Sequence, residues 1–199
     1  MNKILIFISF VITHNLLAST PGFIQECMDC HGSEGVSTES DIPTIAGASA
    51  LFIEDTLIAY KEDLRPAIES KYRAGNTERT ATDMKKIVEL LSEEQLSEVA
   101  DYFSKKPFVA AKQPFDAVFA KIGKKIHEKK CQKCHEDGGS SSEDDAGILA
   151  GQWTPYLKES MKHFLDASRE TDKKMKKKID KLSDKEWQAL LDYYASQQD

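Results

Sequence analysis

Apolar residues recur every three or four positions in several stretches of the chain, which is the spacing of one face of a helix. Such stretches cover residues 96–103, 115–126 and 187–194, and no stretch shows the alternation typical of a strand. A further helix is expected to begin at Thr154-Pro155, because Pro is tolerated in the first turn, and to continue through Tyr156–Leu165. The pattern therefore predicts an all-α protein.

Two of these helices carry the same start signal. Ser92 and Ser183 are each followed three residues later by a Gln or a Glu, which is the pattern of a capping box. The side chains that these two helices are expected to bury are Leu96, Val99, Phe103, Trp187, Leu190, Leu191 and Tyr194. The stretch that leads into Cys131 has its helical spacing at Phe115, Val118, Phe119, Ile122 and Ile126.

The first 18 residues have a different pattern. An almost uncharged apolar run extends from Ile4 to Ala18 after a single lysine, which predicts a secretory signal cleaved near its end. An uncleaved membrane anchor is the alternative, but His14 and Asn15 interrupt the run, and about 20 apolar residues are needed to cross a bilayer. We therefore expect an exported, periplasmic mature chain with no membrane span.

Composition narrows the class of protein further. The 199 residues suit one or two domains, the hydrophobic fraction is 40%, and the formal net charge is −6. An acidic chain is poorly suited to the phosphate backbone, so nucleic acid is not an expected partner. The chain has four cysteines, which in an exported protein would ordinarily form disulfides, so their spacing decides what they do.

The four cysteines fall into two identical frames of the form C-x-x-C-H. This is the attachment motif of c-type haem, in which the two thiols join the vinyl groups and the histidine binds the iron. Two residues between the thiols let one helical turn span both vinyl groups. The motif residues are Cys27, Cys30 and His31 in the first frame and Cys131, Cys134 and His135 in the second. The sequence thus predicts two covalently bound haem c groups.

Zinc and a redox disulfide are the alternative uses of paired cysteines. The pairs of a zinc ribbon lie about 15–20 residues apart, whereas 104 residues separate Cys27 from Cys131. A thioredoxin-type redox site needs one C-x-x-C pair. Two identical frames that use every cysteine of the chain favour haem.

The two frames belong to an internal repeat. The offset of 104 residues that superposes the frames also places Tyr60 on Phe164. Further along the chain the offset is 91 residues, and Met84 then aligns with Met175. The difference between the two offsets corresponds to extra residues in the first copy, between residues 64 and 76.

The repeat predicts the domain organisation. We expect a signal peptide at residues 1–18, one helical haem domain at 19–106 and a second at 107–199, joined by the linker Phe108–Pro114. Each domain has about 90 residues, so the largely apolar haem would supply much of its core.

A haem iron with one histidine ligand needs a sixth ligand if it transfers electrons. Methionine sulfur favours ferrous iron and raises the potential, and Met84 and Met175 occupy matching places in the repeat, so we expect both as sixth ligands. Met161 is expected to pack in the core, and His127 and His163 are expected to be surface or interface side chains. If both irons have six protein and porphyrin ligands, no coordination position is left for a substrate. The sequence therefore favours electron transfer over catalysis.

Charge is divided unevenly between the two halves. Residues 19–106 contain 9 basic and 17 acidic residues, whereas residues 107–199 contain 17 basic and 16 acidic ones. A run of lysines at 173–178 surrounds Met175. Two interpretations stay open: a solvated loop that balances the haem propionates, or a docking patch, in which case the two domains would face different partners.

The two-domain pattern resembles the periplasmic di-haem cytochromes made of two class I cytochrome c domains. More narrowly, residues 110–198 resemble the cytochrome subunit of flavocytochrome c sulfide dehydrogenase. The wider likeness rests on Cys27–Gly32, Pro43–Gly47 and Met84, and the narrower one on Ala111–Asp116, Cys131–Gly139, Ile148–Leu157, Lys173–Met175 and Tyr194–Gln198. One departure is Glu136 after the second motif, where the first motif has Gly32, so the two haem pockets are not expected to be identical.

The resemblance implies a heterodimer with an FAD-containing sulfide dehydrogenase flavoprotein. Electrons from sulfide would pass through the two haems to a soluble cytochrome or an oxidase, and no catalytic residue would lie in this chain. The implied axial pairs are His31 with Met84 and His135 with Met175. Two other functions stay open: a free periplasmic di-haem shuttle to a terminal oxidase, and a di-haem enzyme acting at an open iron.

Overall fold

The computed structural model describes residues 20–198, so the expected signal peptide lies outside the described residues. Within this range the chain forms eight α-helices and two short 3₁₀ turns, Ser33–Gly35 and Asp137–Gly139. The helices are α1 (Gly22–His31), α2 (Ala50–Lys61), α3 (Met84–Glu89), α4 (Glu93–Ser104), α5 (Ala117–Lys130), α6 (Thr154–Leu165), α7 (Lys173–Ile179) and α8 (Asp184–Ala195). The one pairing of extended segments in the described chain is an isolated bridge between Ser70 and Thr82. The expected all-α fold is confirmed.

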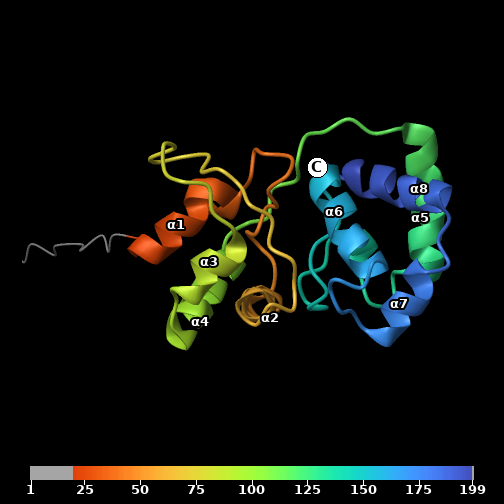
Figure 1. Cartoon of the computed structure of the whole chain (residues 1–199). Coiled ribbons are helices and arrows are strands. Elements are labelled where there is room, and N and C mark those ends of the chain that lie inside the picture. Colours follow the sequence, from red (N-terminus) through yellow and green to blue (C-terminus); the bar gives the residue numbers. More distant parts are fainter. Residues whose placement is uncertain (1–19, 199) are drawn as a thin grey trace, which may run out of the picture.

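The helices form two halves with the same order of elements (Figure 1). Helices α1–α4 make the first half, and α5–α8 make the second. The chain between them, from Lys105 to Asp116, contains no helix and crosses from one half to the other along one side of the molecule. Each half begins with the helix that leads to a C-x-x-C-H motif and ends with a helix that has a capping box.

The core of the first half lies between α1, α2 and α4. Phe103 is fully buried, and Leu96 and Val99 are 2% and 1% exposed, as their spacing on α4 predicts. Ile24 from α1 and Leu57 from α2 complete the same apolar cluster. The Ser92 hydroxyl accepts from the backbone N–H of Gln95, which confirms the capping box.

The second half is built on a close contact between α5 and α8. Leu190, Leu191 and Tyr194 of α8 are buried as expected. The buried face of α5 consists of Ala120, Gly123 and His127. A Cβ atom at Gly123 would lie 1.9 Å from the carbonyl oxygen of Ala189 on α8, so the two helix backbones can approach only because this position has no side chain.

The apolar spacing on α5 predicts that a helix forms there. It does not predict which face of the helix packs against the rest of the domain. Val118 and Ile122 are 68% and 47% exposed, and Phe115, just before the helix, is 43% exposed. Of the apolar residues at helical spacing, Ile126 packs against the core, whereas Phe115, Val118 and Ile122 do not lie on the buried face. The small residues turn toward α8 because they permit close contact, and the larger apolar side chains are then carried outward.

The extra chain of the first half folds over α1. The backbone N–H groups of Arg73 and Ala74 donate to the carbonyl oxygen of Asp29, at 2.8 and 2.9 Å. Arg79 forms ion pairs with Glu26, at 2.7 Å, and with Asp29. This segment therefore covers the outer side of the first motif, and the second half has no counterpart of it.

None of the helices within residues 20–198 combines the length and the apolar character that a membrane span requires.

Candidate functional site

The first motif lies in the last two turns of α1. His31 is 8% exposed, and its Nδ1 lies 2.8 Å from the carbonyl oxygen of Pro43. Because a carbonyl oxygen can only accept, Nδ1 carries the proton, and Nε2 keeps the lone pair that a metal would bind. Burial lowers the pKa of His31, which keeps the imidazole neutral, the form that ligates iron. The geometry thus prepares His31 as an axial ligand.

The two thiols of this motif are poor candidates for a redox pair. Burial, with a smaller contribution from the charge of Glu26, raises the pKa of the Cys27 thiol to about 12, and burial also raises the pKa of Cys30. A reactive cysteine of the thioredoxin type needs a depressed pKa. Cys27 and Cys30 are free of disulfide bonds in this structure, as the thioether links of haem c require.

The second motif has a different backbone. Helix α5 ends at Lys130, and turns carry the chain from Cys131 to Cys134. His135 is partly buried, and its Nδ1 atom is buried without a hydrogen-bond partner among residues 20–198. The carbonyl oxygen of Pro43 holds the ring of His31, whereas the Nδ1 atom of His135 has no such partner in this range, so the two rings are held differently. This supports the expectation that the two pockets are not identical.

The two motifs lie in different halves of the molecule. Figure 1 places α1 and α5 at opposite sides, with α2 and α6 between them. A zinc ribbon would need both cysteine pairs around one metal ion, and this arrangement keeps them apart. Each half therefore offers its own set of two thiols and one imidazole, the donor set that suits one c-type haem.

The two expected methionine ligands hold different positions on their helices. Met84 is the first residue of α3, is partly buried and packs against the core of the first half. Met175 is the third residue of α7, and its Sδ accepts a hydrogen bond from the hydroxyl of Thr171 at 3.1 Å. The N-caps Asp83 and Asp172 thus stand one and three residues before the methionines. Iron ligation by Met84 and by Met175 stays a prediction.

Two histidines and one methionine of the second half have buried side chains. His127 is fully buried, and its Nδ1 lies 3.0 Å from the Tyr194 hydroxyl. His163 is 9% exposed and lies 3.1 Å from Glu159. Of the expected surface or interface location, the surface alternative is therefore wrong for both histidines. Met161, also 9% exposed, packs in the interior as expected.

A contact between the halves was not foreseen from the sequence. Gln152, 3% exposed, accepts from the backbone N–H of Thr44 at 3.1 Å and donates to its carbonyl oxygen at 2.9 Å. The indole N–H of Trp153 donates to the carbonyl oxygen of Ser37 at 3.1 Å. Thr44 directly follows Pro43, the partner of His31, so a side chain of the second half holds the loop that orients the first imidazole.

Replacing Gln152 by Ala should destabilise the protein by about 1–3 kcal/mol, because two buried backbone groups of Thr44 lose their partners. Denaturant unfolding of the haem-loaded protein measures this loss. Lys185→Ala at an exposed position of α8 is the control and should stay within about 0.5 kcal/mol of wild type. Equal stabilities for the two variants would show that the Gln152 contact does not hold the loop.

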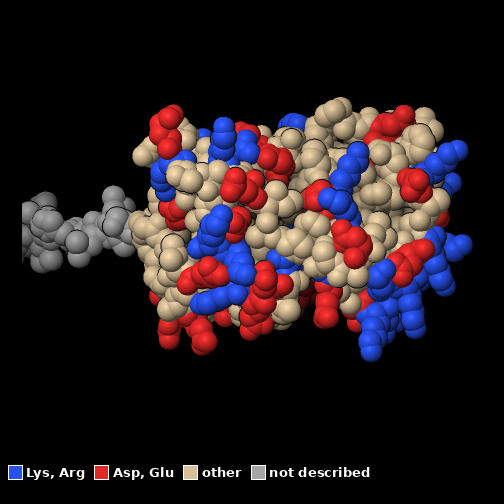
Figure 2. All heavy atoms as spheres, viewed as in Figure 1, with Lys and Arg blue, Asp and Glu red and all other residues tan. Residues whose placement is uncertain are grey.

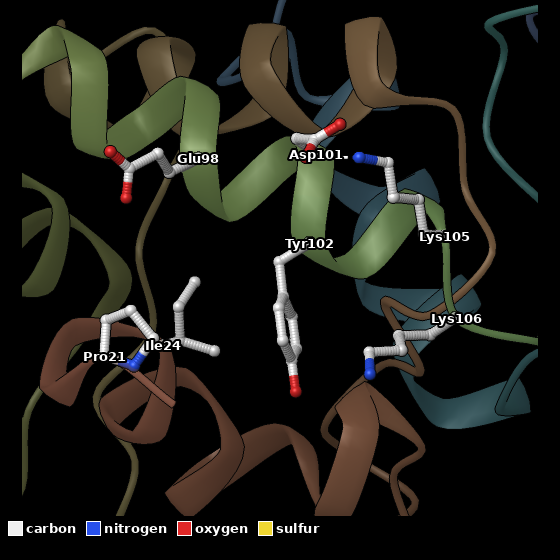
Figure 3. A pocket seen from close by; sticks show the side chains of 7 residues that line it. All are labelled: Pro21, Ile24, Glu98, Asp101, Tyr102, Lys105 and Lys106. Atoms are coloured by element: carbon white, nitrogen blue, oxygen red, sulfur yellow. Dashed lines mark hydrogen bonds and ion pairs between the residues drawn. The ribbon is translucent and has the colours of Figure 1, made fainter. Parts of the chain in front are cut away.

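One hollow in the surface lies away from both motifs. It has a volume of about 420 Å³ and opens between the start of α1 and the end of α4 (Figure 3). Two carboxylates and two ammonium groups line it, and Asp101 pairs with Lys105 at 2.6 Å. Its lining residues are Pro21, Ile24, Glu98, Asp101, Tyr102, Lys105 and Lys106. No motif cysteine, histidine or expected methionine ligand is among them.

A second hollow, of about 450 Å³, is lined by lysines and adjoins the second motif. The lysines come from the end of α5, from α7 and from the loop after it: Lys129, Lys130, Lys174, Lys177, Lys178 and Lys181. We call this surface the lysine hollow. Figure 2 shows basic side chains gathered over the α7 end of the second half. Lys130, at the end of α5, directly precedes Cys131, so this surface lies next to the second haem attachment.

Comparison with known proteins identifies the family. The family described as cytochrome c matches residues 22–105, and the family described as cytochrome C oxidase, cbb3-type, subunit III matches residues 119–193. Cytochrome c-554(548) of Halomonas halodenitrificans is 30% identical over 81 residues, which cover 41% of this chain and 84% of that protein. The chain belongs to the cytochrome c family.

Relatives of this cytochrome also match over both halves. Cytochrome c4 of Stutzerimonas stutzeri is 26% identical and covers 97% of this chain and 98% of its own. The crystal structure of reduced cytochrome c4 from Pseudomonas stutzeri has a TM-score of 0.70 at 25% identity, with 87% of this chain and 94% of that chain covered. Cytochrome c4 of Acidithiobacillus ferrooxidans has the same TM-score at 23% identity, which shows a shared fold.

The fold and the cofactor follow from these observations. The chain consists of two tandem class I cytochrome c domains and carries two covalently bound haem c groups. It is a di-haem electron-transfer protein rather than an enzyme. In each half two thiols and the imidazole that follows them, His31 or His135, form a donor set that fits such a group.

Proposed function

We propose that this cytochrome is a free periplasmic carrier that receives electrons from one partner and delivers them to another, such as a terminal oxidase. Support comes from relatives that are cytochromes c4 and match both halves. Each haem supplies a one-electron carrier. The chain supplies the ligands, the exclusion of water and the surfaces that partners approach.

The proposed iron ligands are His31 with Met84 in the first domain and His135 with Met175 in the second. The proposed thioether links join Cys27 and Cys30 to the first haem, and Cys131 and Cys134 to the second. In the first domain the Pro43 carbonyl fixes the ligating tautomer of the histidine. A thioether sulfur opposite such an imidazole favours the ferrous state, which suits transfer between soluble partners.

The proposed boundaries remain those predicted from the sequence. Residues 1–18 would direct export, residues 19–106 would hold the first haem, and residues 107–199 would hold the second. The periplasmic location rests on the apolar run near the N-terminus. It also suits haem attachment to cysteines that would otherwise form disulfides.

The single observation that carries the two-partner proposal is the lysine hollow. It lies beside the second haem attachment, while the first domain carries a net charge of −8 over residues 19–106. A lysine-lined surface steers an acidic protein toward the second haem and repels a basic one. We therefore propose that an acidic redox protein docks at the lysine hollow, and that a different partner meets the first domain.

Replacing both Lys174 and Lys177 by Glu should lower the rate constant for electron exchange with an acidic partner by about tenfold or more at low ionic strength. Stopped-flow kinetics against ionic strength measures the effect, and the salt dependence should become flatter. The matched control replaces Lys121 and Lys124, exposed lysines of α5 outside the hollow, by Glu. If both double variants slow the reaction equally, net charge rather than the hollow steers the partner.

The second candidate function is the cytochrome subunit of a sulfide-oxidising flavoenzyme. The resemblance of residues 110–198 to the cytochrome subunit of flavocytochrome c sulfide dehydrogenase favours this function. The exposed apolar side chains of Val118 and Ile122 also favour it, because a permanent subunit interface would cover them. Purification from the native periplasm separates the two functions. A carrier should emerge without flavin, whereas a subunit should emerge in an FAD-containing heterodimer whose haems are reduced when sulfide is added.

A further inference from the structure

The two residues before α7 hold both ends of Met175. Asp172 is the N-cap of α7, and its carboxylate accepts hydrogen bonds from the backbone N–H groups of Lys174 and Met175, at 2.7 and 3.4 Å. The hydroxyl of Thr171 donates to the Sδ atom of Met175 at 3.1 Å. Two consecutive residues therefore bind the backbone and the sulfur of the same methionine.

The contact between the hydroxyl and the sulfur is set by the start of the helix. Thr171 stands four residues before Met175 and one position before the N-cap, so the first turn of α7 brings the two side chains together. Both side chains are partly buried. A β-branched side chain such as that of Thr has few rotamers, which limits where its hydroxyl can point. The geometry thus directs a hydrogen-bond donor at the sulfur.

The first domain anchors the corresponding stretch of chain in another way. Ser70 and Thr82 exchange two backbone hydrogen bonds, at 2.7 and 2.9 Å, which tie the chain before Met84 to the extra residues of the first copy. Thr80, which the offset of 91 aligns with Thr171, is exposed and makes no hydrogen bond with Met84 within residues 20–198. The second domain lacks the extra residues, so its methionine is held by the preceding side chains instead.

A hydrogen bond to this sulfur is compatible with ligation of an iron. A thioether sulfur has two lone pairs, so one can bind a metal while the other accepts a proton from a hydroxyl. The hydrogen bond withdraws electron density from the ligand, and ferric iron depends on that density more than ferrous iron does. Hydrogen bonds to ligands are among the features by which proteins tune a metal centre.

We propose that Thr171 is a positioning residue of the second haem. Its hydroxyl holds the Met175 sulfur in the orientation for iron ligation and raises the reduction potential of this haem. The inference rests on the proposed ligation of the second iron by Met175, and it does not depend on the identity of any partner protein. Because Met84 has no such donor, the effect is confined to the second domain.

The test uses the purified di-haem protein and three variants. Thr171→Val removes the hydroxyl with little change of shape, Thr171→Ser keeps it, and Thr80→Val is the matched control in the first repeat. One readout is the reduction potential of each haem, by spectroelectrochemical titration. The other is the NMR resonance of the Met175 methyl group in the ferrous protein, which the haem ring displaces when the sulfur binds iron. Met175→Leu assigns this resonance by its loss.

Thr171→Val should shift the equilibrium of the second haem toward the ferric state by about two- to tenfold, the change that one hydrogen bond can make to an equilibrium. It should also move the Met175 methyl resonance and leave the first haem unchanged. Thr171→Ser should keep both readouts close to wild type, and Thr80→Val should alter neither. If Thr171→Val does not fold, Thr171→Ala removes the same hydroxyl and has the same expected result.

Two results would overturn the inference and leave the proposed ligands in place. One is a displaced Met175 resonance in the wild type that, like the potential, is unchanged in Thr171→Val. The other is a shift in Thr171→Ser as large as that in Thr171→Val, because the hydroxyl would then not be its cause. A wild-type protein without a displaced Met175 resonance would instead show that Met175 is not the ligand, and the inference would fall with that assignment.

Discussion

Replacing Met84 by His is expected to lower the reduction potential of the first haem by about 0.1 V or more. Axial ligands set haem potentials over a range of about 0.8 V, and a thioether sulfur favours the ferrous state more than an imidazole does. The Met84 side chain is partly buried against the core formed by α1, α2 and α4, so the new imidazole would remain on the side of the haem pocket. Spectroelectrochemical titration, which separates the two haems, measures the shift.

The second haem should keep its potential in this variant. Met175→His should give the reverse result, with the first haem unchanged. Met161→Leu is the control, because Met161 is buried on α6 and is not an expected ligand, and it should leave both potentials unchanged. An unaltered spectrum and potential in Met84→His would show that Met84 is not the sixth ligand.

Replacing Gly123 by Ala is expected to destabilise the second domain by about 3 kcal/mol or more. The added Cβ would lie 1.9 Å from the Ala189 carbonyl oxygen and 2.7 Å from the Tyr193 Cβ, and neither atom is the end of a flexible side chain. Overpacking of an interior costs about 1–3 kcal/mol, and more when backbone must move. Helices α5 and α8 would therefore have to separate, which moves the second haem motif.

The measurement is denaturant unfolding followed through the absorption of each haem. Gly22→Ala is the matched control, because Gly22 also lies on a helix that leads to a motif, and no described atom lies within 4 Å of the added Cβ. The control should equal or slightly exceed wild type in stability. Similar stabilities for Gly123→Ala and Gly22→Ala would contradict the close contact of α5 with α8.

Short sequence patterns predicted the elements that are determined by contacts between residues close together in the chain. The capping boxes at Ser92 and Ser183 place the starts of α4 and α8, because a hydroxyl three residues before its backbone partner is a local contact. The side chains that face the core on these helices follow from the same register. The C-x-x-C-H frames are equally local, so both haem motifs could be recognised without a structure.

The orientation of α5 could not be obtained in this way. Its apolar spacing is that of a helix. Which face packs depends on where side chains are small enough for the partner helix to come close. A glycine at 123 and an alanine at 120 permit close contact with α8, and Val118 is left exposed on the other side of the helix. A periodicity argument counts large apolar residues and therefore misses a contact made by small ones.

Residues that join the two domains were missed because their partners lie far away in the sequence. Gln152 bonds a loop 108 residues earlier, and Arg65 bonds a tyrosine 91 residues later. One signal for Arg65 was present, since the offset of 104 that aligns Tyr60 with Phe164 also aligns this arginine with Arg169. The helix registers of Met84 and Met175 differ by two residues, which the shared offset of 91 does not reveal.

The central claim is that both irons are closed by a histidine and a methionine, so that each haem exchanges electrons and binds no substrate. Carbon monoxide tests this most directly, because it binds ferrous haem where the sixth position is open. Absorption spectra of the fully reduced protein under carbon monoxide should remain unchanged at both haems, while Met84→Ala should form an adduct at the first haem alone. Ready formation of an adduct at either haem of the wild-type protein would contradict the claim.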